Sequence, residues 1–208
     1  MIVRTLALLS AVALTTCGRG GGEGIDLARA MGLPAEVGAI CGNPLILGER
    51  IADIGGPGSC GIEDAVRVHA VGKVRLSPSA RINCQTAQAL YEWTTGAAQP
   101  VARQAGTSLT GLKIAASYSC RRRNNASSGK LSEHARGNAV DISAFRFANG
   151  ETVTVLGDWA GGDWSPMLQT VHAEACGPFG VVLGPRANRY HRDHFHFDIS
   201  NRSSRYCR

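Results

Sequence analysis

The sequence lacks three features, and each absence excludes a class of protein. It has no run of about 20 apolar residues, the length that a membrane-spanning helix needs. No two of its seven cysteines form a Cys-x-x-Cys pair, which argues against a metal site built from thiolates. Aromatic and basic residues are not interleaved and no nucleic-acid-binding motif occurs, so we expect no nucleic-acid partner.

The composition is that of a globular domain. The chain has 208 residues, of which 44% are hydrophobic and 18% charged, enough to bury a core without help. The formal net charge is +6. This charge favours anionic surroundings such as a cell-wall polymer or a phospholipid surface, but it does not choose between them.

The first 17 residues have the pattern of a signal peptide. Arg4 precedes an apolar run of the length of a signal-peptide core. Residues 14–18, LTTCG, resemble a bacterial lipobox, in which Cys17 would become the lipid-modified first residue. Thr16 departs from that pattern, so simple cleavage without lipidation stays open. We therefore expect an exported protein of the periplasm or cell envelope, with a possible lipid anchor at Cys17.

The remaining cysteines form an even set, as a disulfide framework requires. The sequence does not determine their pairing. They are Cys41, Cys60, Cys84, Cys120, Cys176 and Cys207. Residues 18–33 begin with GRGGGEG and are expected to be a glycine-rich linker. The domain itself is expected to cover residues 34–208.

Four of the six histidines lie in two short stretches. The first, SEHARGNAVD at 132–141, places His134 seven residues before Asp141. Gly137 lies between them and permits a bend or close approach of the backbone. An imidazole, a carboxylate and one further imidazole form a recurring zinc-binding set that leaves one position open for water. We expect the two stretches to converge on one zinc ion.

The second stretch, HRDHFHFDI, lies about sixty residues later and alternates at period two, as a strand does. The alternation places Phe195 and Phe197 in the core and leaves His194, His196 and Asp198 together on the other face. A His-x-His pair on a strand is often only hydrogen-bonded. Its combination with the first stretch is what makes the metal interpretation specific.

Apolar and alternating stretches predict the secondary structure. Strands are expected at residues 65–74, 111–118, 140–145, 151–156 and 180–184. Asn83 and Ser165 are the expected N-caps of two helices. The predicted fold class is α+β: a small antiparallel sheet that carries the metal site, with helices packed against it and disulfides that stabilise it.

These motifs resemble two known families. The pattern S-x-H-x-x-G-x-A-x-D at 132–141, followed by H-x-H at 194–196, resembles the LAS group of zinc metallopeptidases. That group contains D-alanyl-D-alanine carboxypeptidases, lysostaphin-type enzymes, murein endopeptidases and the hedgehog domain. Residues 34–208 also resemble the bacterial extensin-like C-terminal domain through the segments CGIEDAV, INCQTAQALYEW and HFHFD. No proline-rich repeat accompanies them.

The resemblance to the peptidases implies a set of site residues. His134, Asp141 and His196 would be the zinc ligands. Arg121, at the end of a predicted strand, would stabilise the negative oxygen that forms during hydrolysis. The match at Arg121 is looser, because related enzymes often have Tyr-Arg where this chain has Cys-Arg.

Three residues are candidates for the general base. Relatives use either an acidic residue three positions before the last ligand, here Asp193, or a nearby histidine. Strand alternation places His194 on the ligand face and favours it over Asp193. His191 is the third candidate.

The expected function is an exported, zinc-dependent peptidase or amidase that acts on peptidoglycan stem peptides or cross-links. The alternative is a cell-wall binding module that keeps the zinc without hydrolysis, as the hedgehog domain illustrates. A structural wall protein whose histidines bind no metal is a third reading. The bond that is cleaved and the oligomeric state stay open.

Overall fold

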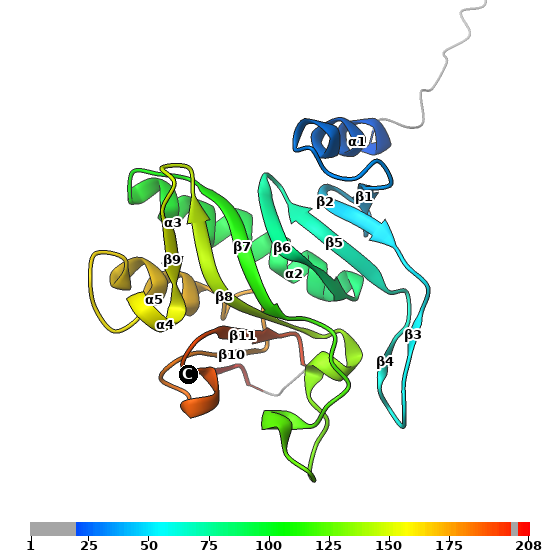
Figure 1. Cartoon of the computed structure of the whole chain (residues 1–208), viewed down its shortest axis with the longest axis vertical. Helices are drawn as coiled ribbons and strands as arrows, with labels where there is room; N and C mark the ends of the chain where they lie inside the picture. The colour runs from blue at the N-terminus through cyan, green and yellow to red at the C-terminus, as the bar shows by residue number, and fades with distance from the viewer. Residues whose placement is uncertain (1–19, 201–203) are drawn as a thin grey trace, which may run out of the picture.

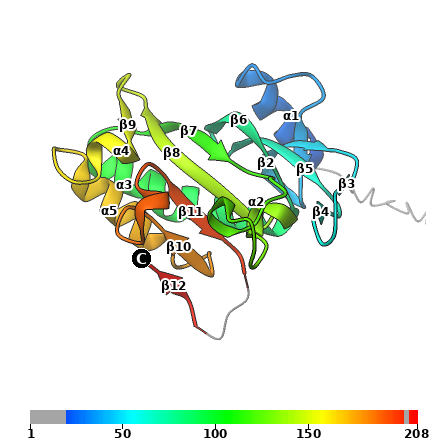
Figure 2. The same cartoon turned by 60° about the horizontal axis from the view of Figure 1, so that its bottom comes forward.

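A single large sheet organises the fold (Figures 1 and 2). The computed structural model describes residues 20–200 and 204–208, so the expected signal peptide and Cys17 lie outside the described residues. The prediction of a small antiparallel sheet is wrong in size. Ten strands form the main sheet, in the order β1-β2-β5-β6-β7-β8-β11-β10-β12 with β9 paired to β8. Most pairs are antiparallel, but β6 with β7 and β10 with β12 are parallel.

The strands have the following bounds. They are β1 Gly38–Ile40, β2 Asn43–Arg50, β3 Ile54–Gly55, β4 Gly61–Ile62, β5 Val66–Val71, β6 Val74–Ile82, β7 Leu109–Ala116, β8 Ala139–Phe147, β9 Thr152–Thr154, β10 Val181–Leu183, β11 Phe195–Asp198 and β12 Tyr206–Cys207. Strands β3 and β4 form a separate hairpin, which extends from the sheet on the right of Figure 1. The predicted combination of helices with a mainly antiparallel sheet is confirmed.

The helical elements are fewer. The α-helices are α1 Gly20–Ala30, α2 Cys84–Trp93, α3 Gln99–Gln104, α4 Val155–Asp158 and α5 Ser165–Glu174. A π-helical turn η1 Thr94–Ala98 joins α2 to α3, and the 3-10 turns are η2 Arg123–Asn125, η3 Glu133–Arg136 and η4 Arg189–His191. None of the helices within residues 20–200 and 204–208 is long and apolar enough to cross a membrane.

The sheet is larger than predicted because its N-terminal strands do not have a strand-like sequence. Strand β2 contains Pro44 and Gly48 within NPLILGER, and both residues weaken a strand assignment. Gly48 is needed because a Cβ there would collide with the carbonyl oxygen of Arg67 on β5. The register shifts at this point, so the glycine accommodates a close approach of two backbones.

Helix α1 occupies part of the segment that was predicted to be a flexible linker. From residue 20 on, the glycine-rich segment is helical, and Gly24 lies against Ala39 of β1. Ala28 is buried in a small apolar cluster with Leu47 and Ala70. That cluster lies apart from the main core, and α1 lies next to β1 and β2 at the top of Figure 1.

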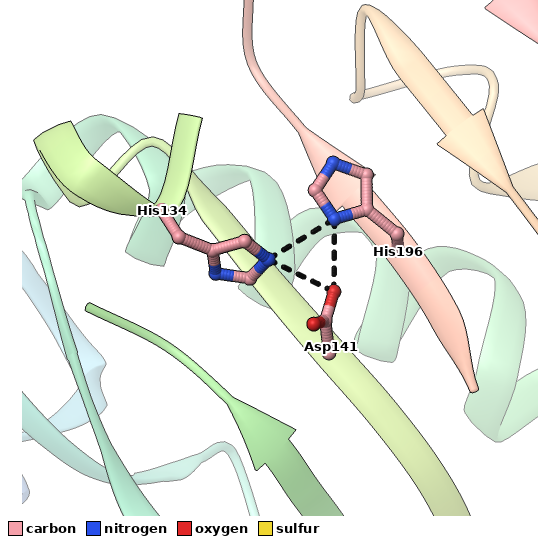
Figure 3. Close-up of side chains that lie close together, drawn as sticks. All are labelled: His134, Asp141 and His196. Atoms are coloured by element: carbon pink, nitrogen blue, oxygen red, sulfur yellow. Dashed lines mark hydrogen bonds and ion pairs between the residues drawn. The ribbon is translucent and has the colours of Figure 1, made fainter. Parts of the chain in front are cut away.

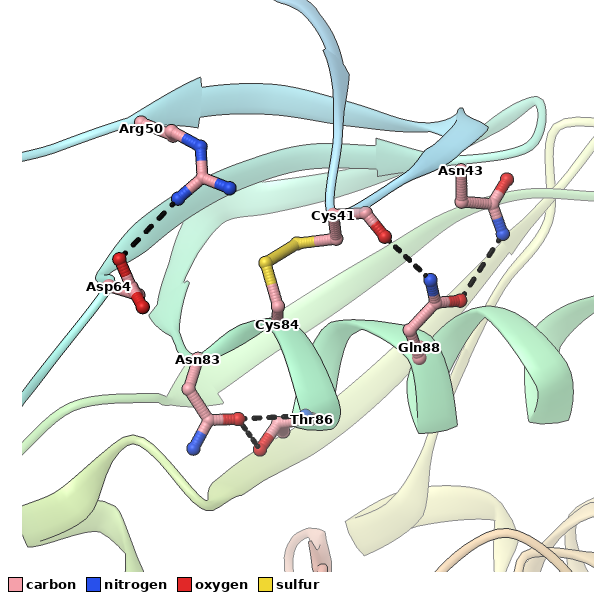
Figure 4. The surroundings of a disulfide bond; sticks show 8 residues. All are labelled: Cys41, Asn43, Arg50, Asp64, Asn83, Cys84, Thr86 and Gln88. Carbon is pink, nitrogen blue, oxygen red and sulfur yellow. Dashed lines mark hydrogen bonds and ion pairs between the residues drawn. A yellow bond between two sulfur atoms is a disulfide. The ribbon is translucent and has the colours of Figure 1, made fainter.

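Helix α2 begins as the sequence predicts. The Asn83 side chain accepts a hydrogen bond from the Thr86 backbone N–H at 2.8 Å (Figure 4). At the other end, Trp93 is buried and its indole N–H donates to the Val171 carbonyl of α5 at 2.8 Å. The ring of Trp93 also packs edge-on against Phe197 of β11, with 5.1 Å between centroids. This one side chain therefore connects two helices to the strand that carries the second histidine stretch.

Two predicted boundaries differ from the structure. The strand expected at residues 151–156 ends at Thr154, after which the chain turns into α4. Ser165 is the first residue of α5 rather than its cap, and its hydroxyl donates to the Trp159 carbonyl at 2.7 Å. That internal hydrogen bond takes the hydroxyl away from the helix N-terminus.

Three disulfides connect all six cysteines that were expected to pair. Cys41–Cys84 joins the β1–β2 turn to the start of α2 (Figure 4). Cys176–Cys207 joins the chain after α5 to β12. Cys60–Cys120 ties the β3–β4 hairpin to the loop after β7. The disulfide framework predicted from the cysteine count is confirmed.

Gly137 forms the turn between η3 and β8. Its φ is +68°, the left-handed region that glycine adopts at little cost. A Cβ there would lie 2.5 Å from Cδ1 of Ile62 on the β3–β4 hairpin. Its carbonyl accepts from the backbone N–H of Asn83 at 3.1 Å and from the Thr86 hydroxyl at 2.9 Å. The turn is therefore packed between the hairpin and the start of α2.

We expect Gly137→Ala to lower the free energy of unfolding by about 2–4 kcal/mol, since it combines backbone strain with a collision in the core. Gly96→Ala is the matched control: Gly96 is exposed in η1, has no positive φ and has no atom within 4 Å of an added Cβ. Urea unfolding of both variants measures the difference. Equal stabilities would contradict this account of the turn.

Candidate metal centre

His134, Asp141 and His196 converge on one point at the surface of the sheet (Figure 3). Nε2 of His134 lies 3.1 Å from Oδ1 of Asp141 and 3.1 Å from Nδ1 of His196. Nδ1 of His196 lies 2.8 Å from the same Asp141 oxygen. All three residues are buried. The structure thus brings together the three residues that the sequence predicted as ligands.

The sheet itself places two of the three residues. Asp141 on β8 and His196 on β11 are direct cross-strand partners in the antiparallel register, and side chains in such pairs are near neighbours. The third, His134, comes from η3 and is returned toward β8 by the left-handed turn at Gly137. Three residues from distant parts of the sequence therefore meet through one strand pair and one turn.

Hydrogen bonds on the far side of each imidazole determine which nitrogen carries the proton. Nδ1 of His134 lies 2.6 Å from the carbonyl oxygen of Ser117, which can only accept, so Nδ1 is the donor. Nε2 of His196 lies 3.1 Å from Oδ2 of Asp198, which is likewise an acceptor. In their neutral forms both histidines therefore turn a lone pair toward the Asp141 carboxylate.

Three acceptor atoms thus face one another at 2.8–3.1 Å with no donor among them. Such an arrangement is stable only with a positive charge at its centre, which a proton or a metal ion can supply. Zinc–nitrogen and zinc–oxygen bonds of about 2.0–2.1 Å give ligand separations of about 3.3 Å in a tetrahedral site. The triangle is close to that size, so the donor set and its spacing fit a divalent metal ion.

The close contacts between the triad residues also shift the pKa values of Asp141 and His196. Burial alone would raise the pKa of Asp141, but the charges and hydrogen bonds of His134 and His196 outweigh burial and hold that pKa well below its usual range. Burial alone would lower the pKa of His196, but hydrogen bonds and charges from Asp141 and Asp198 raise it to about 9. The site therefore favours a bound cation.

Asp198 is the partner that orients His196. It is buried, and its other carboxylate oxygen accepts from the backbone N–H of Ser200 at 2.9 Å and from the Ser200 hydroxyl. Burial alone would raise the pKa of Asp198, but the hydrogen bond and charge of His196 outweigh burial and lower it. The carboxylate therefore stays ionised. Metal-binding histidines commonly donate their second N–H to such a carboxylate, which fixes the ring.

His194 and Asp193, two candidate bases, form a pair beside the triad. Nε2 of His194 lies 3.6 Å from Oδ2 of Asp141, while its Nδ1 lies 2.8 Å from Oδ1 of Asp193. The Asp193 side chain is 58% exposed, against 17% for that of His194. Asp193 reaches the site through His194, with which its carboxylate is hydrogen-bonded. Both residues precede β11, so the strand alternation that favoured His194 applies to neither of them.

A pocket of about 330 Å³ opens over the triad. Its wall includes Arg121 and His191, the two remaining candidates. The Arg121 guanidinium contacts only the Arg122 carbonyl, at 3.4 Å, and has no carboxylate partner among the described residues. Nδ1 of His191 lies 2.9 Å from the Asn188 side-chain oxygen, and burial together with the charges of His196 and His194 lowers the pKa of His191 to about 4. Three of the four candidate catalytic residues, Arg121, His191 and His194, therefore line the pocket, and Asp193 contacts it through His194.

The sequence missed several residues of this site. The Ser117 carbonyl is a backbone group, and no sequence signal could identify it. Asn124 and Asn125 line the pocket from the loop after β7, and Tyr190 and Asn188 line it from η4. Their only signal is position: each lies within a few residues of Arg121 or His191.

The two remaining histidines lie elsewhere, as expected from the sequence. His172 on α5 packs against the rings of Phe195 and Trp159, and burial lowers its pKa to about 4. His69 lies on β5, where its Nε2 is 3.6 Å from Glu49. Neither residue belongs to the triad.

The fold and site define a disulfide-linked, mixed α/β protein with a candidate His/Asp/His metal centre on its sheet. Residues 44–208 match the model of the extensin-like protein C-terminus, so the chain belongs to the extensin-like C-terminal family. The matched region contains every residue of the candidate centre. No curated protein and no solved structure shows significant similarity to the chain.

We expect the protein to bind one divalent cation per chain, and Asp198→Asn to weaken that binding by about 10- to 100-fold, since it removes the charge that orients and polarises His196. Asp193→Asn is the matched control: it makes the same chemical change in a carboxylate that contacts His194 and lies outside the triad. Competition with a chromogenic zinc chelator measures both affinities. An equal loss in the two variants would show that Asp198 has no special role.

Proposed function

We propose that the protein is an exported, zinc-dependent hydrolase that cleaves amide bonds in peptidoglycan stem peptides or cross-links. The observation that carries the proposal is the convergence of three acceptor atoms at 2.8–3.1 Å beneath an open pocket. Beside them, Nε2 of His194 lies 3.6 Å from the second oxygen of Asp141. A metal site that is open to a pocket and flanked by a base is the arrangement of a catalytic site rather than a structural one.

The residues of the triad would hold the metal ion through Nε2 of His134, Nδ1 of His196 and Oδ1 of Asp141. Zinc bound there would supply a Lewis acid that activates water and polarises a carbonyl group. The Ser117 carbonyl and Asp198 keep both imidazoles in the tautomer that binds a metal. The choice of zinc rests on this mixed nitrogen and oxygen donor set, which suits zinc better than magnesium or calcium.

His194 is the best-placed general base. Its Nδ1–H donates to Asp193, so its free Nε2 is the nitrogen that can take a proton from water and pass it to the leaving amine. Asp193 would act as a positioning residue that orients the ring of His194, so these two candidate bases would work together in one proton transfer. Asn188 holds the ring of His191, which lies 5.3 Å from that of His194 between centroids and lines the pocket.

Arg121 would stabilise the negative charge that develops on the carbonyl oxygen during attack. It is half-buried, lines the pocket and has no competing carboxylate among residues 20–200 and 204–208. A fixed cation in a partly dehydrated pocket stabilises such charge more strongly than it would in water. The S-x-H-x-x-G-x-A-x-D and H-x-H patterns, which resemble those of LAS peptidases, support the same roles.

Other features of the chain support a substrate in the cell wall. The six cysteines after Cys17 form three disulfides, and disulfides persist in oxidising compartments outside the cytoplasm. The signal-peptide pattern and the candidate lipid-modified Cys17 agree with export to the periplasm or envelope. The net charge of +6 favours an anionic polymer such as peptidoglycan.

We expect the zinc-loaded protein to release soluble fragments from purified peptidoglycan, and His194→Ala to slow the release by about 100-fold or more while it retains the metal. His69→Ala, which alters a histidine outside the pocket, should match the wild type. Chromatography of the released fragments, with metal analysis of each variant, makes the measurement.

A metal-loaded wild-type protein that releases no fragments, relative to His196→Ala, would overturn the proposed hydrolase. If that protein still bound peptidoglycan, the chain would be a zinc-dependent binding module instead. A protein without bound metal would remove the basis for both.

A further inference from the structure

The loop after β7 is a fixed hairpin that forms part of the pocket wall. Arg122 forms a β-bridge with Leu131, and the backbone N–H of Ser132 donates to the Arg121 carbonyl at 3.0 Å. The guanidinium of Arg123 lies 3.5 Å from the buried carboxylate of Glu133, and Arg122 donates to the Gly129 carbonyl. The base of the loop is further tied by the Cys60–Cys120 disulfide. The loop is therefore held in place before any ligand binds.

Asn124 and Asn125 lie in this hairpin with unusual backbone angles. Both have a φ of +55°, in the left-handed region. Asparagine adopts this region more readily than most residues, but glycine does so at still lower cost. The backbone of the loop would therefore be formed at least as well by glycine at either position. The side chains need a separate explanation.

Both residues line the pocket that opens over the triad. In the described part of the chain, neither carboxamide makes a hydrogen bond. Their neighbour Arg123 is already paired with Glu133. The two asparagines thus offer unpaired, uncharged donors and acceptors on the same wall as Arg121.

A carboxamide has the donor and acceptor groups that complement a peptide group: its NH₂ donates to a carbonyl, and its oxygen accepts from an N–H. Resting on the hydrolase proposed above, we propose that Asn124 and Asn125 are specificity-determining residues that bind the peptide groups of the substrate next to the bond that is cleaved. They act in binding, while the chemistry stays with the triad and His194.

The test compares glycine and alanine at both positions. Asn124→Gly/Asn125→Gly keeps the left-handed backbone and removes only the carboxamides. Asn124→Ala/Asn125→Ala removes them and adds backbone strain. With soluble muropeptides as substrate, we expect both variants to raise KM by about three- to tenfold per lost hydrogen bond and to leave kcat within about twofold. Only the alanine variant should also lose about 2–4 °C of Tm per strained residue.

Asn149→Gly is the matched control, because Asn149 lies in the β8–β9 turn and its side chain binds Glu151. It should keep the wild-type KM. If the asparagines serve only the backbone, the glycine variant will match the wild type and the alanine variant alone will be impaired. That result would overturn the inference.

A binding measurement separates this inference from the proposed function. Calorimetry of muropeptides with the zinc-loaded His194→Ala chain, with and without the two glycines, needs no turnover. Binding that the glycines weaken supports the inference even if the wild type hydrolyses nothing. Binding that they leave unchanged overturns the inference alone, and the absence of any binding and any hydrolysis overturns both proposals.

Discussion

The mutual approach of three acceptor atoms is the constraint on which the rest of the structure depends. Asp141 and His196 face each other across β8 and β11, and His134 joins them from the preceding turn. Each atom would repel the others if no cation offset their charge and lone pairs. The fold nevertheless holds them at 2.8–3.1 Å, through groups that fix each ring from behind. The three residues are therefore held in an arrangement that could bind a cation.

The core enforces this geometry from the other side of the same strand. Phe195 and Phe197 are fully buried and pack against each other. Phe197 also packs against Trp93, and Phe195 against Phe145. A slip of one residue in the pairing of β11 would turn both rings toward the pocket and bury His196 in the core. The free energy that resists such a slip is therefore the hydrophobic free energy of two aromatic side chains. Apolar packing on one face holds the polar geometry on the other.

The sequence predicted the parts of the molecule that depend on local periodicity or on residue type. The alternation of β11, the cap at Asn83 and the presence of disulfides among six cysteines all agree with the structure. The size of the sheet was missed, because β2 contains Pro44 and Gly48 and its pairing with β5 depends on the close approach that Gly48 permits. The group behind His134 is a backbone carbonyl, and Asn124 and Asn125 reach the pocket through tertiary structure. No residue pattern encodes these contacts.

A comparison of two histidines shows why the partners of a buried group decide its role. His172 and His196 are each 8% exposed. His172 is surrounded by the rings of Trp159 and Phe195, and burial lowers its pKa to about 4, so it is neutral. His196 lies between two carboxylates, which raise its pKa to about 9 despite burial. Burial therefore does not create a cation site; the carboxylates that accompany the imidazole do. Asp141 comes from the first histidine stretch and Asp198 from the second.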